Sequence, residues 1–235
     1  MRRTLSLFAS LLTFATPAAA DGPVVVELFT SQGCSSCPPA DAMLHRLAER
    51  PDVIALALHV DYWDYIGWED IFGKPEHTRR QQGYARASQA RSVYTPQMVI
   101  AGQDLVVGSK PMDVADLIQT HRDRATGVKI ALQRAGDRLQ ITGETQRSLP
   151  AGTVVQVVRY IPSQSVNITR GENAGEQFEY TNIVIDWDVA AEWSGAGDLD
   201  LLVPVSGSAP VVVIVQQPGS GAVGPGAIMA AAALR

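Results

Sequence analysis

The chain has very few cysteines: Cys34 and Cys37 are the only two among 235 residues. It has no basic stripe, and its net charge is −5, so a nucleic acid is not an expected partner. A secreted protein that relies on disulfides usually has several, joining distant segments. One bridge across so short a loop removes little entropy from the unfolded chain. This scarcity therefore favours a chemical role for the pair over a stabilising one.

The first twenty residues have the features of an export signal. Met1-Arg2-Arg3 is a positive start, Leu5–Ala15 is a short apolar stretch, and Pro17–Ala20 ends in small residues suited to cleavage. An uncleaved membrane anchor is the alternative, which the shortness of the apolar stretch disfavours. Because residues 1–20 contain two arginines and no acid, cleavage changes the net charge from −5 to −7. We expect a periplasmic or secreted protein without a membrane span.

Residues 21–125 predict an α/β domain with a mixed central sheet flanked by helices. Apolar, β-branched runs are typical of strands buried on both faces, whereas apolar residues at helical spacing indicate a helix with one buried face. The elements expected on these grounds are strands at Val24–Phe29 and Val53–Val60, helices at Ala40–Glu49 and Glu76–Ala90, a hairpin of Gln97–Ala101 with Asp104–Val107, and a closing helix through Val114 and His121. The expected order is β-α-β-α-β-β-α, with the first two strands parallel.

From residue 126 onward the pattern changes to alternating apolar and polar residues. Val128, Ile130 and Leu132 begin it, and further strand-like runs separated by turn residues follow. This pattern predicts an all-β, sandwich-like domain. We therefore expect three segments: a signal peptide at 1–20, an α/β domain at 21–125 and a β domain at 126–235.

The order of elements, together with Cys34-Ser35-Ser36-Cys37-Pro38 and Thr95-Pro96, resembles the thioredoxin fold. More narrowly, the chain resembles a family of exported, thioredoxin-like bacterial proteins catalogued as a domain of unknown function. The segments that are similar to this family span nearly all of the chain after the signal: Phe29–Ala40, His59–Tyr65, Tyr94–Gln97 and Arg170–Gly175.

The resemblance implies a redox site. Cys34, at the amino end of a helix, would be the nucleophile, because the helix dipole stabilises its thiolate, and Cys37 would be the resolving thiol. Pro96 would be cis and would face the cysteines, leaving the backbone of Thr95 free to pair with a substrate peptide. Glu27 would be the buried acid that exchanges protons with Cys37.

Several of these residues have a second interpretation. Glu27 is equally consistent with an ion pair to a nearby arginine, or with a solvated position at a strand end. Trp63 belongs to an aromatic loop that would form a wall of the substrate groove or pack against the β domain. The segment Arg170-Gly171-Glu172-Asn173 predicts a polar turn, although a loop touching the cysteines is the alternative.

The expected function is thiol–disulfide exchange with protein or peptide cysteines and a redox partner protein, without a cofactor. Two alternatives remain open. One is a binding or scaffold protein in which Cys34–Cys37 is a static clasp. The other is a copper chaperone that uses Cys34, Cys37 and His59, although the set of metal ligands is short and we expect no metal site.

Overall fold

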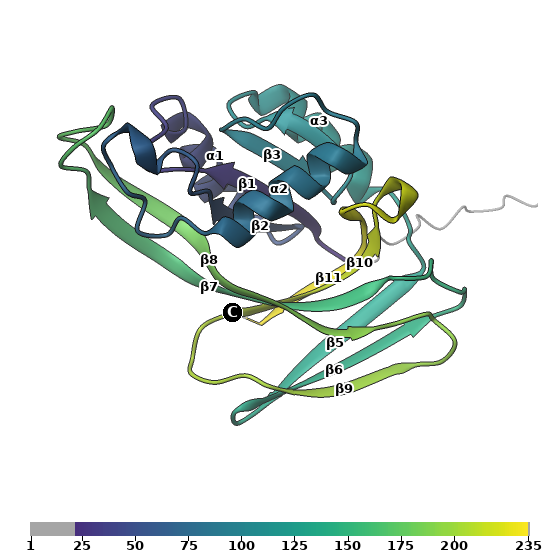
Figure 1. The fold of residues 1–235 in the computed structure, drawn as a ribbon. Coiled ribbons are helices and arrows are strands. Elements are labelled where there is room, and N and C mark those ends of the chain that lie inside the picture. The colour runs from purple at the N-terminus through teal and green to yellow at the C-terminus, as the bar shows by residue number, and fades with distance from the viewer. Residues whose placement is uncertain (1–21, 235) are drawn as a thin grey trace, which may run out of the picture.

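The structure is a computed structural model that describes residues 22–234 (Figure 1). The predicted signal peptide, residues 1–20, lies outside the described residues. The described elements, in chain order, are β1 (Val24–Thr30), α1 (Pro38–Ala48), β2 (Val53–His59), the 3₁₀ turn η1 (Asp64–Ile66), α2 (Pro75–Ala87), β3 (Gln97–Ile100), β4 (Asp104–Val107), α3 (Pro111–Arg122), β5 (Val128–Ala135), β6 (Arg138–Thr145), β7 (Val154–Asn167), β8 (Gln177–Glu192), β9 (Leu199–Pro204), β10 (Val211–Pro218), the 3₁₀ turn η2 (Ser220–Ala222) and β11 (Pro225–Leu234). The element order predicted for residues 21–125 is confirmed.

A mixed eight-stranded sheet, in the order β11-β10-β7-β8-β2-β1-β3-β4, forms the centre of the molecule. Strands β1 and β2 are parallel, with Val24 opposite Val53. Strands β3 and β4 form the predicted antiparallel hairpin, and β3 pairs with β1. The carboxyl ends of β1 and β2 therefore lie side by side, and the loop that follows β1 contains both cysteines.

Helices cover both faces of the sheet around β1 (Figure 1). On one face Val24, Val26 and Leu28 pack with apolar residues of α1 and α3. On the other face Val25 and Phe29 pack with residues of β2, the C-terminal strands and α2, including Tyr84. Because successive side chains of a strand point to opposite faces, β1 is apolar along nearly its whole length.

The C-terminal strands form a two-layered arrangement, but one layer is not a separate sheet. The three-stranded sheet β5-β6-β9 packs on β7, β10 and β11 through a shared apolar cluster. These last strands, with β8, continue the main sheet, since β8 pairs in parallel with β2 at Ala57 and Ile183. The fold thus differs from a self-contained sandwich because β8, at 16 residues, is long enough to cover the edge of β2 that would otherwise stay unpaired. The division of the chain at residue 125 stays a prediction.

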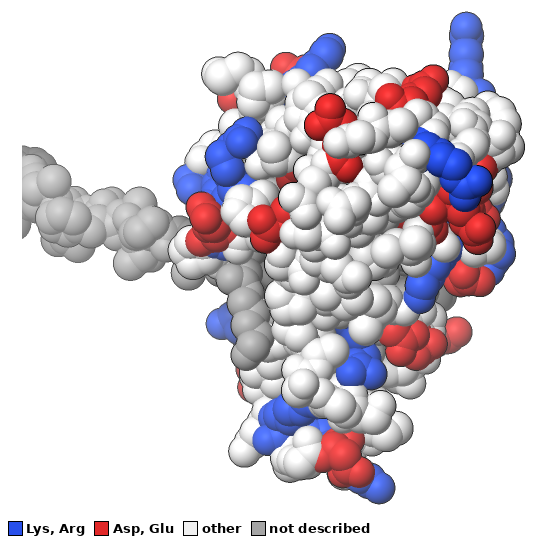
Figure 2. Space-filling model, turned by 90° about the vertical axis from the view of Figure 1, so that its left-hand side faces the viewer, with Lys and Arg blue, Asp and Glu red and all other residues white. Residues whose placement is uncertain are grey.

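Charged side chains of both signs are interspersed on the face of the molecule that Figure 2 shows. No stripe of one sign crosses this face. Among residues 22–234, no helix has the length and apolar character needed to cross a bilayer.

A buried ion pair joins the two halves of the chain. Glu27 of β1 is 0% exposed, and it accepts hydrogen bonds from Arg80 Nε at 2.6 Å, Arg80 Nη2 at 2.9 Å and the Tyr84 hydroxyl at 2.5 Å. Arg80 also donates to Gln216 of β10 and lies over the Trp187 ring of β8, 3.8 Å from its centroid. Burial acts to lower the pKa of Arg80, but Glu27 and Tyr84 together outweigh this and raise it.

Replacing Arg80 with methionine is expected to destabilise the protein by about 3–5 kcal/mol, because it leaves the Glu27 carboxylate buried without a counter-ion. Urea unfolding measures the change. The matched control is Arg79→Met, which removes an exposed ion pair to Glu76 on the same helix and is expected to cost less than about 1 kcal/mol. Equal losses for the two variants would contradict the assignment.

Candidate functional site at the Cys34–Cys37 disulfide

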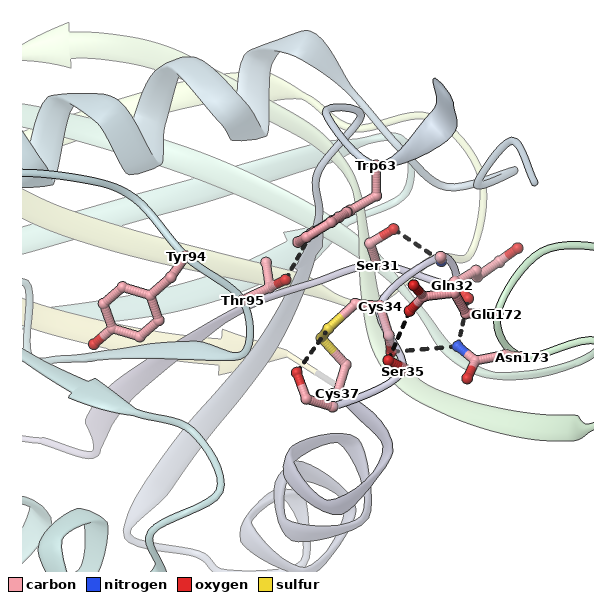
Figure 3. The surroundings of a disulfide bond; sticks show 12 residues. Ser31, Gln32, Cys34, Ser35, Cys37, Trp63, Tyr94, Thr95, Glu172 and Asn173 are labelled. Atoms are coloured by element: carbon pink, nitrogen blue, oxygen red, sulfur yellow. Dashed lines mark hydrogen bonds between the residues drawn. A yellow bond between two sulfur atoms is a disulfide. The ribbon is translucent and has the colours of Figure 1, made fainter. Parts of the chain in front are cut away.

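Cys34 and Cys37 form a disulfide in the loop between β1 and α1, with their Cα atoms 5.4 Å apart (Figure 3). Cys37 is the residue that precedes the first turn of α1, and Pro38 and Pro39 follow it. Proline suits this place because the first N–H groups of a helix have no partner within it. The sequence therefore positions the sulfurs at the positive end of the helix dipole.

The disulfide is more enclosed than the sequence predicts. Cys34 is the more exposed of the two residues, as expected, but only 4% of it is exposed, and Cys37 is 0% exposed. A disulfide sulfur has no hydrogen to donate, so the 3.5 Å contact between Ser36 Oγ and Cys34 Sγ is a bond donated by the serine. Little of Cys34 is therefore open to a partner sulfur.

The tip of the β7–β8 hairpin binds the loop that holds Cys34. Asn173 Nδ2 donates to the backbone oxygens of Gln32 and Cys34, at 2.8 and 3.3 Å, and Ser35 Oγ donates to Glu172 Oε2 at 2.7 Å (Figure 3). Gly171 packs so closely on Trp68 that an added Cβ would lie 3.1 Å from the Trp68 Cβ. The sequence shows the polar turn here, but this pairing joins residues more than a hundred positions apart and has no local signal.

Thr95 and Trp63 lie on the other side of the disulfide (Figure 3). The Thr95–Pro96 peptide bond is cis, and Trp63 Nε1 donates to Thr95 Oγ1 at 2.7 Å. Trp63 also packs against the apolar cluster around Phe29. The structure thus brings Cys34, Cys37, Thr95 and Trp63 into one place.

Glu27 does not join this group, and its role as the acid beside Cys37 stays a prediction. It lies on the sheet face of Val25 and Phe29, whereas α1, which follows Cys37, packs on the face of Val26 and Leu28. The ion pair with Arg80 is the alternative that the structure favours. An apolar run buried on both faces conceals which face each residue occupies, so the sequence could not separate the two interpretations.

A second polar cluster, absent from the predicted site, lies on the α1 side of the strand ends. His59 Nδ1 and Asp70 Oδ2 are 2.7 Å apart, and both side chains are fully buried. Asp70 Oδ2 also accepts from the backbone N–H of Gln32 at 2.7 Å. Asp41 of α1 completes the cluster, since its carboxyl lies near enough to Thr30 and His59 for both to act on its pKa.

The Asp41 carboxyl has a perturbed pKa. Although the residue is partly exposed, burial of the carboxyl raises its pKa from 3.8 to about 7. His59 and Thr30 oppose this rise, and Asp70 adds to it. A signal for this residue is present in the sequence, since Asp41 follows Cys37 by four positions and so lies on the same helix face. Strongly perturbed carboxyls often mark functional sites.

His59, a ligand in the copper-chaperone alternative, is packed between aromatic rings. The Phe72 and Tyr180 rings contact its ring edge to face, with centroids 5.2 and 4.8 Å away. Within residues 22–234, no group of three or more histidine, cysteine, aspartate or glutamate side chains is arranged to hold a metal ion.

The comparisons with known proteins identify the family. A family described as "Protein of unknown function (DUF1223)" matches residues 25–216. The chain belongs to this family. The crystal structure of a protein from Agrobacterium tumefaciens is similar to this DUF1223 chain, with 32% sequence identity and a TM-score of 0.78, over 92% of this chain and 96% of the other. No curated protein matches the chain.

Replacing Asp41 with asparagine is expected to stabilise the oxidised protein in a pH-dependent way. The raised pKa means that the native state favours the protonated carboxyl, a preference lost as the pH rises through about 7. Because asparagine cannot ionise, the gain over wild type should grow from about 1 kcal/mol at pH 4.5 to as much as about 4 kcal/mol at pH 8. Chemical denaturation at the two pH values measures it, and a difference independent of pH would contradict the buried carboxyl.

Replacing Asn173 with alanine is expected to make the disulfide easier to reach. The change removes two bonds to the Cys34 loop, each worth about 1 kcal/mol, so reduction by a water-soluble phosphine should accelerate by up to roughly thirtyfold. Thiol release over time measures the rate. Asn167→Ala, at an exposed position of the same hairpin, is the control. Identical rates for the two variants would show that the hairpin tip does not restrain the loop.

Proposed function

We propose that this DUF1223 chain is an exported thiol–disulfide oxidoreductase that acts on cysteines of protein or peptide partners. The observation that supports it most is the placement of the only two cysteines, bonded to one another at the amino end of α1. A helix amino end stabilises a thiolate, and a reactive thiolate is what exchange requires. The export signal expected from residues 1–20 implies a compartment in which disulfides persist.

The finer assignment to a thioredoxin-like site gains support from the surroundings of the disulfide. The cis Thr95–Pro96 bond and Trp63 lie beside the sulfurs, and Trp63 holds the Thr95 side chain. The Thr95 backbone would then pair with an extended partner peptide, and Trp63 would form one wall of the groove that holds this peptide.

The proposed exchange needs no cofactor. A partner thiolate attacks Cys34 Sγ, the Cys34–Cys37 bond breaks, and Cys37 leaves as a thiolate. A second partner thiolate then attacks the partner sulfur bonded to Cys34, so that a partner disulfide forms and Cys34 is released. Two electrons and two protons pass from the partner to this chain, and the reverse sequence reduces a partner disulfide.

A second candidate is a binding protein in which the disulfide is a static clasp. The burial of both cysteines favours it, as do the hydrogen bonds that hold the Cys34 loop to the hairpin tip. The two candidates differ in reduction potential: oxidoreductases lie between about −270 and −120 mV, whereas structural disulfides lie below about −300 mV.

Equilibration with glutathione buffers should give a potential within the range of the oxidoreductases. Cys37→Ser, which leaves Cys34 without its resolving thiol, should trap mixed disulfides with partner proteins in the exported compartment. Cys34→Ser is the matched control and should trap none, because Cys37 is the buried thiol. A potential below about −300 mV together with no trapped species would instead support the static clasp.

A further inference from the structure

The resolving thiol needs a proton acceptor that is not water. Cys37 is fully buried, and an apolar environment raises the pKa of a thiol. A nearby base would have to remove its proton before it could attack a mixed disulfide on Cys34. Glu27 is bound to Arg80 and lies across the sheet from α1.

Asp41 is placed for this task by the first turn of α1. Its backbone N–H donates to the Cys37 oxygen at 3.1 Å, so the two residues are related as i and i+4 of a helix. Side chains at this spacing are neighbours on one helix face, with Cβ atoms about 5–6 Å apart. The same face of α1 packs against the sheet through Ala40 and Leu44.

The groups that face Asp41 come from three strands and one loop. Thr30 at the end of β1 faces its carboxyl, and His59 at the end of β2, Asp70 and Tyr180 of β8 interact with it electrostatically. His45, four residues further along α1, is exposed and pairs with Thr181. His59 Nδ1 is bonded to Asp70, and its other nitrogen, Nε2, is buried with no hydrogen-bond partner among the described residues.

We propose that Asp41 exchanges a proton with the Cys37 thiol during disulfide exchange, and that the buried His59–Asp70 pair tunes the proton affinity of Asp41. This inference rests on the proposed function and deepens it. The Cys37 thiol gives its proton to the Asp41 carboxylate, and the Cys37 thiolate attacks Cys34 Sγ of a mixed disulfide. The bond between Cys34 and the partner breaks, the Cys34–Cys37 bond forms, and the partner sulfur leaves as a thiolate that accepts a proton from Asp41 or solvent.

The protonation behaviour of Asp41 agrees with this placement. A pKa of about 7 allows the carboxyl both to accept and to return a proton near neutral pH, which is what general acid–base catalysis favours. The hydrogen bond from the Gln32 N–H to Asp70 also links this cluster to the loop that holds Cys34.

The test uses the reduced full-length mature protein and dithiobis(nitrobenzoate), an aromatic disulfide that releases a coloured thiolate. Attack by Cys34 releases one coloured thiolate and leaves a mixed disulfide, and attack by Cys37 releases the second. Stopped-flow absorbance separates the two phases. In Asp41→Asn we expect the first phase to stay within about twofold of wild type and the second to slow by about 10²-fold at pH 7. The rate of the second phase should recover as the pH rises past the ordinary pKa of a thiol, about 8.5.

Asp113→Asn is the matched control, since Asp113 is the exposed acid in the first turn of α3, and it should leave both phases unchanged. His59→Gln should keep the second phase but move the midpoint of its pH profile upward, because His59 lowers the pKa of Asp41. A purely structural role for His59 would change the rates without moving this midpoint.

The outcomes separate this inference from the proposed function. A second phase in Asp41→Asn that matches wild type at every pH overturns the role of Asp41 and leaves the redox assignment intact. A wild-type protein whose Cys34 does not react with the dye overturns both. A measurement independent of kinetics is the carboxyl pKa of Asp41, determined by carbon NMR. It should differ between the disulfide and dithiol forms, and equal values would also overturn the proposal.

Discussion

The buried ion pair between Glu27 and Arg80 is the interaction on which the arrangement of the two halves depends. It places a charge in the middle of the central sheet, which is tolerated only because the guanidinium and the Tyr84 hydroxyl satisfy the carboxylate. Arg80 also bonds to β10 and stacks on Trp187 of β8. One side chain of α2 therefore holds β1 against strands that occur more than a hundred residues later, and keeps the long hairpin aligned with the cysteine loop.

That alignment gives the disulfide two different sides. On one side Trp63 and Thr95 lie next to the sulfurs, and on the other the hairpin tip bonds to the backbone around Cys34. Beneath them, Asp41, His59 and Asp70 form a polar cluster enclosed by aromatic rings. The enclosure hides both cysteines, yet it also supplies the low-dielectric surroundings in which one carboxyl can hold or release a proton near neutral pH.

The local features of this architecture follow from sequence, whereas the pairings between distant residues do not. Helix and strand periods indicate the elements of residues 21–125, and the prolines after Cys37 indicate where α1 begins. The sequence does not show which face of the sheet Glu27 occupies, because β1 is apolar on both faces. The parallel pairing of β8 with β2, which merges two predicted sheets into one, depends on strand length and on an unpaired edge. No local sequence pattern predicts the hydrogen bonds of Asn173 to the cysteine loop. The spacing of Asp41 from Cys37, in contrast, can be read directly from the sequence.

The distance along the chain between Cys34 and Asn173, 139 positions, has a consequence for the order in which the molecule assembles. Closing a loop of that size costs more entropy than forming a helix turn, and it is therefore slower. The two sulfurs, only three positions apart, can meet as soon as α1 begins to form. The two sulfurs can therefore come together while the β7–β8 hairpin is still undocked, and the loop becomes enclosed only when the tip of that hairpin binds it.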